Sequence, residues 1–193
     1  MKDEKHLSSQ FDAEMNAVSS LVMEMGGLVE QQIRNAAEAM IENDADLAKH
    51  VLRNEERVNA FEMQVDHELV SIISRRQPTA RDLRLLIAIA RTISNLERAG
   101  DEAAKMARTV TTLLSNGHAR ILPSSELRLA AGMASDLLRK ALDAFARLDV
   151  PLALENLRAD DLIDIEYEGF TRKLITYMME DPRTISSSLE LMF

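Results

Sequence analysis

Two carboxylates, Glu97 and Asp101, stand four positions apart in a long apolar segment, and they are the residues best placed to do chemistry. Residues at i and i+4 lie on one face of a helix, about one turn apart. The apolar stripe of this segment is centred near Ile93, which leaves Glu97 about 40° and Asp101 about 80° from its centre. We therefore predict that the pair flanks the buried face, where like charges cost free energy unless a cation neutralises them.

Two interpretations of this pair remain open. The first is a metal site, because carboxylate oxygens are the ligands that hard cations prefer. The second is an acid pair on the surface, with Asp101 neutralised by Lys105 at i+4. Spacing alone favours the second interpretation, since exposed charge pairs on helices are common and weak.

Two further pairs of acids have the same spacing. Glu62 and Asp66 lie in the preceding predicted helix, which should run antiparallel to the segment that carries Glu97. Asp160 and Asp164 lie in a later one. Acids from two facing helices can form an all-oxygen site for Mg²⁺, Ca²⁺, Mn²⁺ or iron. The alternative is that each pair lies on a solvated helix face, which is the simpler interpretation in a chain with 32 acidic residues.

Other motifs offer little chemistry. Arg84, Arg91 and Arg98 recur every seven residues and form one stripe, which suits a phosphate, a partner surface or simply solvent. No histidine completes the Glu-x-x-His pattern of di-iron bundles. The sequence also has no Gly-rich phosphate loop, nucleophile elbow or His-Glu-x-x-His motif, so we predict that it is not an enzyme.

Composition predicts an all-α protein. The chain has 193 residues, of which 46% are hydrophobic and 28% charged, with only six glycines, four prolines and 4% aromatic residues. The absence of cysteine excludes disulfides, thiolate zinc sites and cysteine catalysis. A net charge of −9 argues against nucleic-acid binding. No apolar stretch is long enough to span a membrane, and no signal peptide is recognisable.

Helix breakers and capping residues divide the chain into long helices. We expect helices at about 8–43, 44–76, 79–114, 124–148 and 150–180, followed by the beginning of a sixth. The most loop-like segment is 116–123. It separates two predicted domains, residues 1–117 and 118–193, and short connections make sequential helices antiparallel neighbours.

An internal repeat relates the two halves. Residues 28–75 overlay residues 133–180 with an offset of 105, so that Asp44 meets Asp149 and Leu69 meets Leu174. The pattern predicts tandem three-helix bundles, of which the second lacks most of its third helix. By the repeat, the partner of the Glu97 signature falls about ten residues beyond Phe193, so we expect a C-terminally shortened sequence. The uncovered apolar face should favour a dimer or a larger oligomer.

Several specific stretches carry a resemblance to a known family. They are residues 25–32 (MGGLVEQQ), 76–84 (RQPTARDLR), 96–101 (LERAGD), 142–147 (LDAFAR) and 177–181 (YMMED). The chain resembles the PhoU family of accessory regulators of bacterial phosphate transport over essentially its whole length. The resemblance implies a duplicated three-helix bundle and a non-enzymatic, cytoplasmic, oligomeric protein that represses phosphate uptake and the phosphate-starvation response. It implies two partners, the ATP-binding subunit of the phosphate ABC transporter and the phosphate-sensing histidine kinase.

The resemblance also implies metal binding, because several family members carry metal clusters on Glu/Asp-x-x-x-Asp motifs. Glu97 and Asp101 match that motif directly, and Asp160 and Asp164 match it in the second bundle. Asn59 takes the place equivalent to Asp164 in the first bundle. Glu62 and Asp66 match the motif less closely. The metal would be Mg, Mn, Fe or Zn. The alternatives to a regulator are a carboxylate-rich metal-binding or metal-storage bundle and a structural oligomerisation module.

Overall fold

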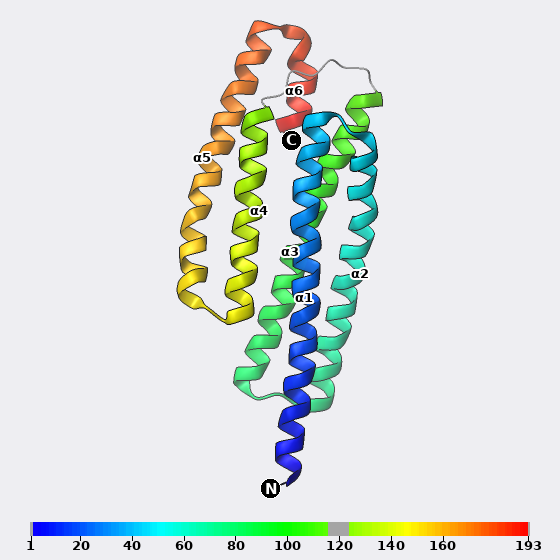
Figure 1. Cartoon of the computed structure of the whole chain (residues 1–193), viewed down its shortest axis with the longest axis vertical. Helices are drawn as coiled ribbons and strands as arrows, with labels where there is room; N and C mark the ends of the chain where they lie inside the picture. The colour runs from blue at the N-terminus through cyan, green and yellow to red at the C-terminus, as the bar shows by residue number, and fades with distance from the viewer. Residues whose placement is uncertain (1, 116–123, 193) are drawn as a thin grey trace.

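The computed structural model describes residues 2–115 and 124–192, which form helices and no strands (Figure 1). The all-α prediction is therefore confirmed for this part of the chain. The elements in chain order are α1 (Lys2–Glu42), α2 (Ala45–Arg76), α3 (Ala80–Ser115), α4 (Ser124–Arg147), α5 (Val150–Glu180), a short 3-10 turn (Pro182–Thr184) and α6 (Ile185–Met192). The first helix begins earlier than the expected Ser8 or Ser9, and the predicted domain boundary at 117–118 lies outside the described residues.

The turns that open α2 and α5 are built alike. Asp44 and Asp149 are both N-caps. The Asp44 side chain accepts hydrogen bonds from the backbone N–H groups of Asp46 and Leu47, and that of Asp149 accepts one from Leu152. The residue before each cap, Asn43 or Leu148, adopts a left-handed φ of 58° or 53°. A side-chain acceptor at the N-cap satisfies donors that the first helical turn leaves unpaired. The 105-residue repeat is thus visible as the same local turn geometry at two places.

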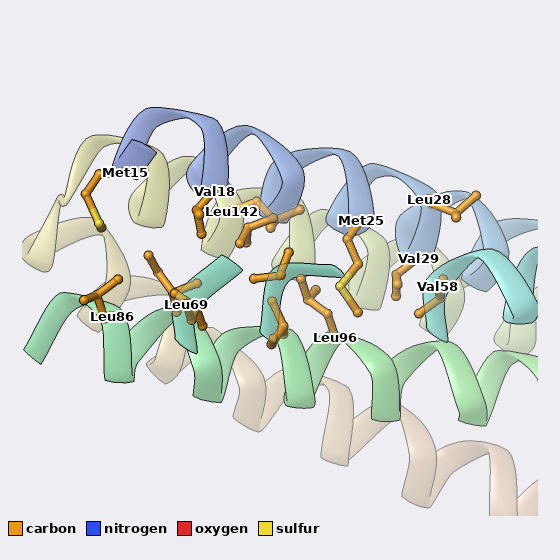
Figure 2. Close-up of a cluster of buried hydrophobic side chains, with 14 of the residues drawn as sticks. Met15, Val18, Met25, Leu28, Val29, Val58, Leu69, Leu86, Leu96 and Leu142 are labelled. Atoms are coloured by element: carbon orange, nitrogen blue, oxygen red, sulfur yellow. The ribbon is translucent and has the colours of Figure 1, made fainter. Parts of the chain in front are cut away.

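Helices α1, α2 and α3 pack side by side along most of their length and enclose the main core (Figure 1). Figure 2 shows its large apolar side chains meeting between these helices. A second cluster further along the bundle is rich in alanine, which lets the helices approach closely. Its buried members are Ala36, Ala39, Met40, Ala48, Val51, Ala103, Ala107 and Val110.

Helices α4 and α5 form an antiparallel pair that joins the bundle through α4 and α1 (Figure 1). Leu142 of α4 belongs to the main core and lies among the α1 side chains in Figure 2. Gly26 of α1 makes this possible, because a Cβ there would stand 2.5 Å from a Leu142 methyl group. Arg139 of α4 pairs with Glu30 of α1 near this contact. Further along the same two helices, Nη1 of Arg128 lies 2.6 Å from Oε2 of Glu38.

The outer face of the α4–α5 pair is largely uncovered. Only two of the 31 residues of α5, Phe170 and Leu174, are buried. Between α4 and α5 an apolar groove of about 470 Å³ is lined by side chains such as Phe145 and Leu157. Helix α6 spans only eight residues and contacts α5 and one end of α3. In the described part of the chain, no helix is both long enough and apolar enough to cross a membrane.

Candidate functional site

Four of the predicted site residues come together where α2 meets α3. Glu62 and Asp66 lie on α2, and Glu97 and Asp101 lie on α3. Glu62 interacts electrostatically with Asp66 and Asp101, and Glu97 with Asp101 and Glu62. The antiparallel packing of the two helices therefore places both acid pairs at the same level of the bundle. We call these four residues the carboxylate cluster.

Two members of the cluster, Glu62 and Glu97, have a pKa above the ordinary value. Burial is the main reason that the pKa of Glu62 lies above its ordinary value of 4.5, and the charges of Asp66 and Asp101 add to it. Burial is also the main reason that the pKa of Glu97 is raised. Repulsion from Asp101 and Glu62 and a hydrogen bond with Asp101 raise it further. The guanidinium of Arg98 opposes this rise in pKa. Like charges in a partly desolvated place disfavour ionisation, so the cluster is a point of electrostatic strain.

No lysine or arginine of the described residues forms a salt bridge with the cluster. The expected neutralisation of Asp101 by Lys105 is wrong, because Lys105 instead pairs with Glu102 at 3.8 Å. Further along the same interface, Arg108 of α3 does pair with Glu55 of α2, with Nη1 and Oε2 3.1 Å apart. At the α2–α3 interface, the charge of Glu55 is thus neutralised by Arg108, whereas the charge of the carboxylate cluster is not neutralised by a salt bridge with a described residue.

A close approach of the helices, which the spacing of the acids does not predict, positions the cluster. Gly100 lies between Glu97 and Asp101 and is buried against α1 and α2. A Cβ at this position would stand 3.2 Å from Oε1 of Gln32 and 3.3 Å from Cγ1 of Val58. A glycine inside a helix costs about 1 kcal/mol relative to alanine, and this cost was the available signal that something packs closely there.

Asp160 and Asp164 have a different environment from the first-bundle cluster. Both are exposed on α5, and neither forms an ion pair with the described residues. By the repeat, the positions of Glu62 and Asp66 correspond to Tyr167 and Thr171, about two turns further along α5. The structure therefore brings Glu62 and Asp66, rather than Glu55 and Asn59, opposite Glu97 and Asp101.

The chemistry of the cluster suits a hard cation, since all its side-chain donors are carboxylate oxygens and none of them forms a salt bridge with a described residue. Within residues 2–115 and 124–192, however, no three acidic or histidine side chains are arranged as a ready-made ligand set. Binding of a cation would therefore require rotation of side chains that are partly exposed. The cluster contains no nucleophile or base paired for catalysis.

Comparison with known proteins places these features in a family. A family model for the PhoU domain matches residues 22–110 and 127–193, two segments that begin 105 residues apart, like the repeat. The phosphate-specific transport system accessory protein PhoU of Escherichia coli is 47% identical over 189 residues, which cover 98% of this chain and 78% of that protein. The homologous accessory protein of Edwardsiella tarda is 48% identical over 190 residues, covering 98% of this chain and 77% of that one.

Solved structures agree with the sequence comparison. A crystal structure of PhoU from Pseudomonas aeruginosa superimposes with a TM-score of 0.88 at 43% identity, covering 94% of this chain and 87% of that one. A phosphate transport regulatory protein PhoU from Streptococcus pneumoniae shares the fold, with a TM-score of 0.83 at 24% identity and coverage of 94% and 84%. The predicted tandem helical-bundle fold is thus confirmed, and the chain belongs to the PhoU family.

Proposed function

We propose that this chain is a cytoplasmic accessory protein that represses high-affinity phosphate uptake and the phosphate-starvation response when phosphate is plentiful. The observation that carries the proposal is the 47% identity over nearly the whole chain to a phosphate-specific transport system accessory protein. The described residues are helical and form no catalytic constellation, which favours a protein that acts by binding. In this proposal it is an adaptor and not an enzyme.

The proposed partners are the ATP-binding subunit of the phosphate ABC transporter and the cytoplasmic region of the phosphate-sensing histidine kinase. The chain would reach the membrane through these partners, and its own oligomer would be a homodimer or larger. Its net charge of −9 gives it an acidic surface that suits basic patches on partner proteins.

Complementation tests the regulatory role. In a bacterial strain that lacks its own accessory gene, expression of this chain should restore repression of a phosphate-starvation reporter in phosphate-rich medium. A charge-neutral change of an exposed α1 residue outside the proposed sites, such as Asn16→Gln, should behave like the original chain. Full reporter activity despite normal levels of folded protein would contradict the proposal.

Direct binding tests the adaptor role. The purified chain should be retained by the immobilised ATPase subunit and by the kinase region, each measured separately by surface plasmon resonance. An unrelated ABC transporter ATPase serves as the control surface. Binding to neither partner, or equal binding to the control, would remove the adaptor mechanism even if complementation succeeded.

We further propose that the carboxylate cluster binds a divalent metal ion such as Mg²⁺, Mn²⁺, Fe²⁺ or Zn²⁺. Glu62, Asp66, Glu97 and Asp101 are the residues that would hold it. A cation would supply the positive charge that the cluster lacks and would tie α2 to α3, so binding should stabilise the folded state by mass action. Asp160 and Asp164 lie on a face that no other described helix covers, so we expect weaker binding there.

Thermal unfolding tests this site. After treatment with a chelator, addition of Mg²⁺ or Mn²⁺ should raise the melting temperature, and Glu97→Gln should abolish the rise while the far-ultraviolet spectrum stays helical. Asp164→Asn removes one acid of equal spacing from α5 and is the matched control, which should keep the rise. No shift with any of the four metals would contradict the site, and many bound ions per chain would favour a metal-storage protein instead.

A further inference from the structure

Three arginines form a straight row along the outer face of α3. Arg84, Arg91 and Arg98 are seven residues apart, a spacing that repeats every two turns or about 10.5 Å. All three are exposed, and no described residue forms an ion pair with them. Most other arginines of this acidic chain have an acidic partner, including Arg76, Arg108, Arg128 and Arg139.

The surroundings of the row leave it open to a partner. Around Arg84 and Arg91, the positions three and four residues away on α3 contain no acid. Several neighbours are small or uncharged, namely Ala88, Ser94 and Asn95. Ile87 lies between the first two arginines and is 45% exposed. The face therefore combines three exposed guanidinium groups, none of which forms an ion pair with a described residue, with small or uncharged neighbours and one exposed apolar side chain.

Within residues 2–115 and 124–192, no other helix covers this face. The described elements that contact α3 are α1, α2 and α6, and the first two meet its buried side. Counted around the helix at about 100° per residue, the row lies roughly opposite the buried residues Ile89, Ile93 and Gly100. Figure 1 shows α4 and α5 grouped beside α1, with α5 on the far side of α4 from the bundle.

We propose that the α3 arginine row is a docking surface for an acidic helix of a partner protein. Two helices that lie side by side have the same rise, so carboxylates spaced seven residues apart would meet successive arginines. Each guanidinium can hold a carboxylate in a two-pronged arrangement, which gives direction as well as attraction. The inference does not depend on the proposed role in phosphate uptake.

The charge distribution favours a narrow partner over a broad anionic surface. The row is one residue wide and lies next to Glu97, Asp101 and Glu102 on the same helix. A lipid bilayer or a nucleic-acid duplex would bring its phosphates within a Debye length, about 8 Å, of these acids and would be repelled by the net charge of −9. A single acidic stripe on a helix can approach the arginines without that cost.

Synthetic peptides test the proposal. The probe is a labelled, alanine-based helical peptide of four heptads with glutamate at every seventh position. Its control has the same composition, with the glutamates spread around the helix. At low salt the full chain should bind the phased peptide about tenfold more tightly than the control, measured by fluorescence anisotropy. Raising the salt concentration should weaken the phased complex.

Matched variants locate the binding site. Arg91→Glu should weaken binding of the phased peptide about tenfold, because it replaces attraction with repulsion at the middle of the row. Arg158→Glu makes the same charge change on exposed α5, where no described residue pairs with Arg158, and should have little effect. Circular dichroism and the melting temperature check that both variants are folded.

Three results would overturn the proposal. Equal affinity for the two peptides, or an equal loss with Arg158→Glu, would mean that net charge alone drives binding. Binding to phosphatidylglycerol vesicles that depends on Arg91, without a preference for the phased peptide, would make the row a membrane contact. Dissociation of an oligomer by Arg91→Glu, measured by sedimentation, would make it a contact between copies of this chain.

Discussion

The two halves of the molecule begin their middle helices with the same turn but use those helices differently. Asp44 and Asp149 cap α2 and α5 with nearly identical backbone angles. In α2, seven residues are buried, whereas in the similarly long α5 only two are. The difference is α3, which covers α2 along its length, while α6 covers only one end of α5.

This difference shows which properties are local and which depend on neighbours. A cap and a left-handed residue need only a few adjacent side chains, so both copies of the repeat form them. Burial and a shifted pKa need a second helix opposite. Among the described residues, the carboxylate cluster therefore exists in the first half only, although the second half has an acid pair of the same spacing.

The largest expected effect distinguishes the buried contact between α4 and α1 from the exposed face of α5. Leu142→Ala removes a side chain of the main core, and we expect it to lower the free energy of unfolding by about 2–4 kcal/mol. Leu157→Ala removes a side chain that is 69% exposed on α5 and should cost under about 0.5 kcal/mol. Urea unfolding monitored by circular dichroism measures both. Similar costs would show that the outer face of α5 is buried in solution.

Two adjacent glycines of α1 test whether α4 packs closely on this helix. Gly26→Ala would collide with buried Leu142, and we expect a loss of about 1–3 kcal/mol in the free energy of unfolding. At Gly27 a Cβ meets nothing within 4 Å, so Gly27→Ala should stabilise α1 by up to about 1 kcal/mol. Equal melting temperatures for the two variants would mean that α4 does not pack on α1 as described.

The two caps should have matching effects. Asp44→Ala and Asp149→Ala each remove the acceptor of an N-cap, which typically costs about 1 kcal/mol. Hydrogen exchange should show faster exchange in the first turn of α2 in one variant and of α5 in the other. Faster hydrogen exchange in only one of the two variants would show that the two caps do not contribute equally to their helices.

The smallest effect concerns pH. Because the folded-state pKa of Glu97 lies above its ordinary value of 4.5, the folded protein binds this proton more tightly than the unfolded chain does. The resulting stabilisation is complete below 4.5 and is lost as pH rises through the folded-state pKa. In chelator-treated protein, Glu97→Gln should therefore raise the melting temperature at pH 7 and less so at pH 4.

Asp164→Asn is the control for this pH experiment, because Asp164 is exposed on α5 and no described residue forms an ion pair with it. Its melting temperature should follow that of the original chain across the same pH range. A lower melting temperature of Glu97→Gln at pH 7 in the absence of metal would contradict the raised pKa.

The sequence predicted features that depend on local chemistry. Helix ends followed from Asp44, Pro78, Asp149 and Pro182, because caps and proline act on their immediate neighbours. The proximity of Glu62 to Glu97 followed from the short connection between α2 and α3, which makes these two helices antiparallel neighbours. The Lys105 pairing failed because Glu102, three residues away, competes for the same ammonium group.

Contacts between distant segments could not be predicted in this way. The fit of Leu142 over Gly26, and of Gln32 against Gly100, depends on how closely the helix axes approach each other. Hydrophobic periodicity gives the direction that a side chain faces but not the distance between helices. The repeat likewise aligned Asp160 with Glu55 and did not reveal which acids of α2 face α3.

Buried Gln32 affects how α1 is positioned along α2. Its side chain is fully buried on α1 between the two core clusters, and its Nε2 donates to the carbonyl oxygen of Val51, 3.3 Å away. If α1 moved by one turn relative to α2, this amide would lose its acceptor inside an apolar interior, at a cost of about 1–3 kcal/mol. The hydrogen bond of Gln32 therefore favours one position of α1 along α2. Apolar contacts, which are not directional, would favour that position less strongly.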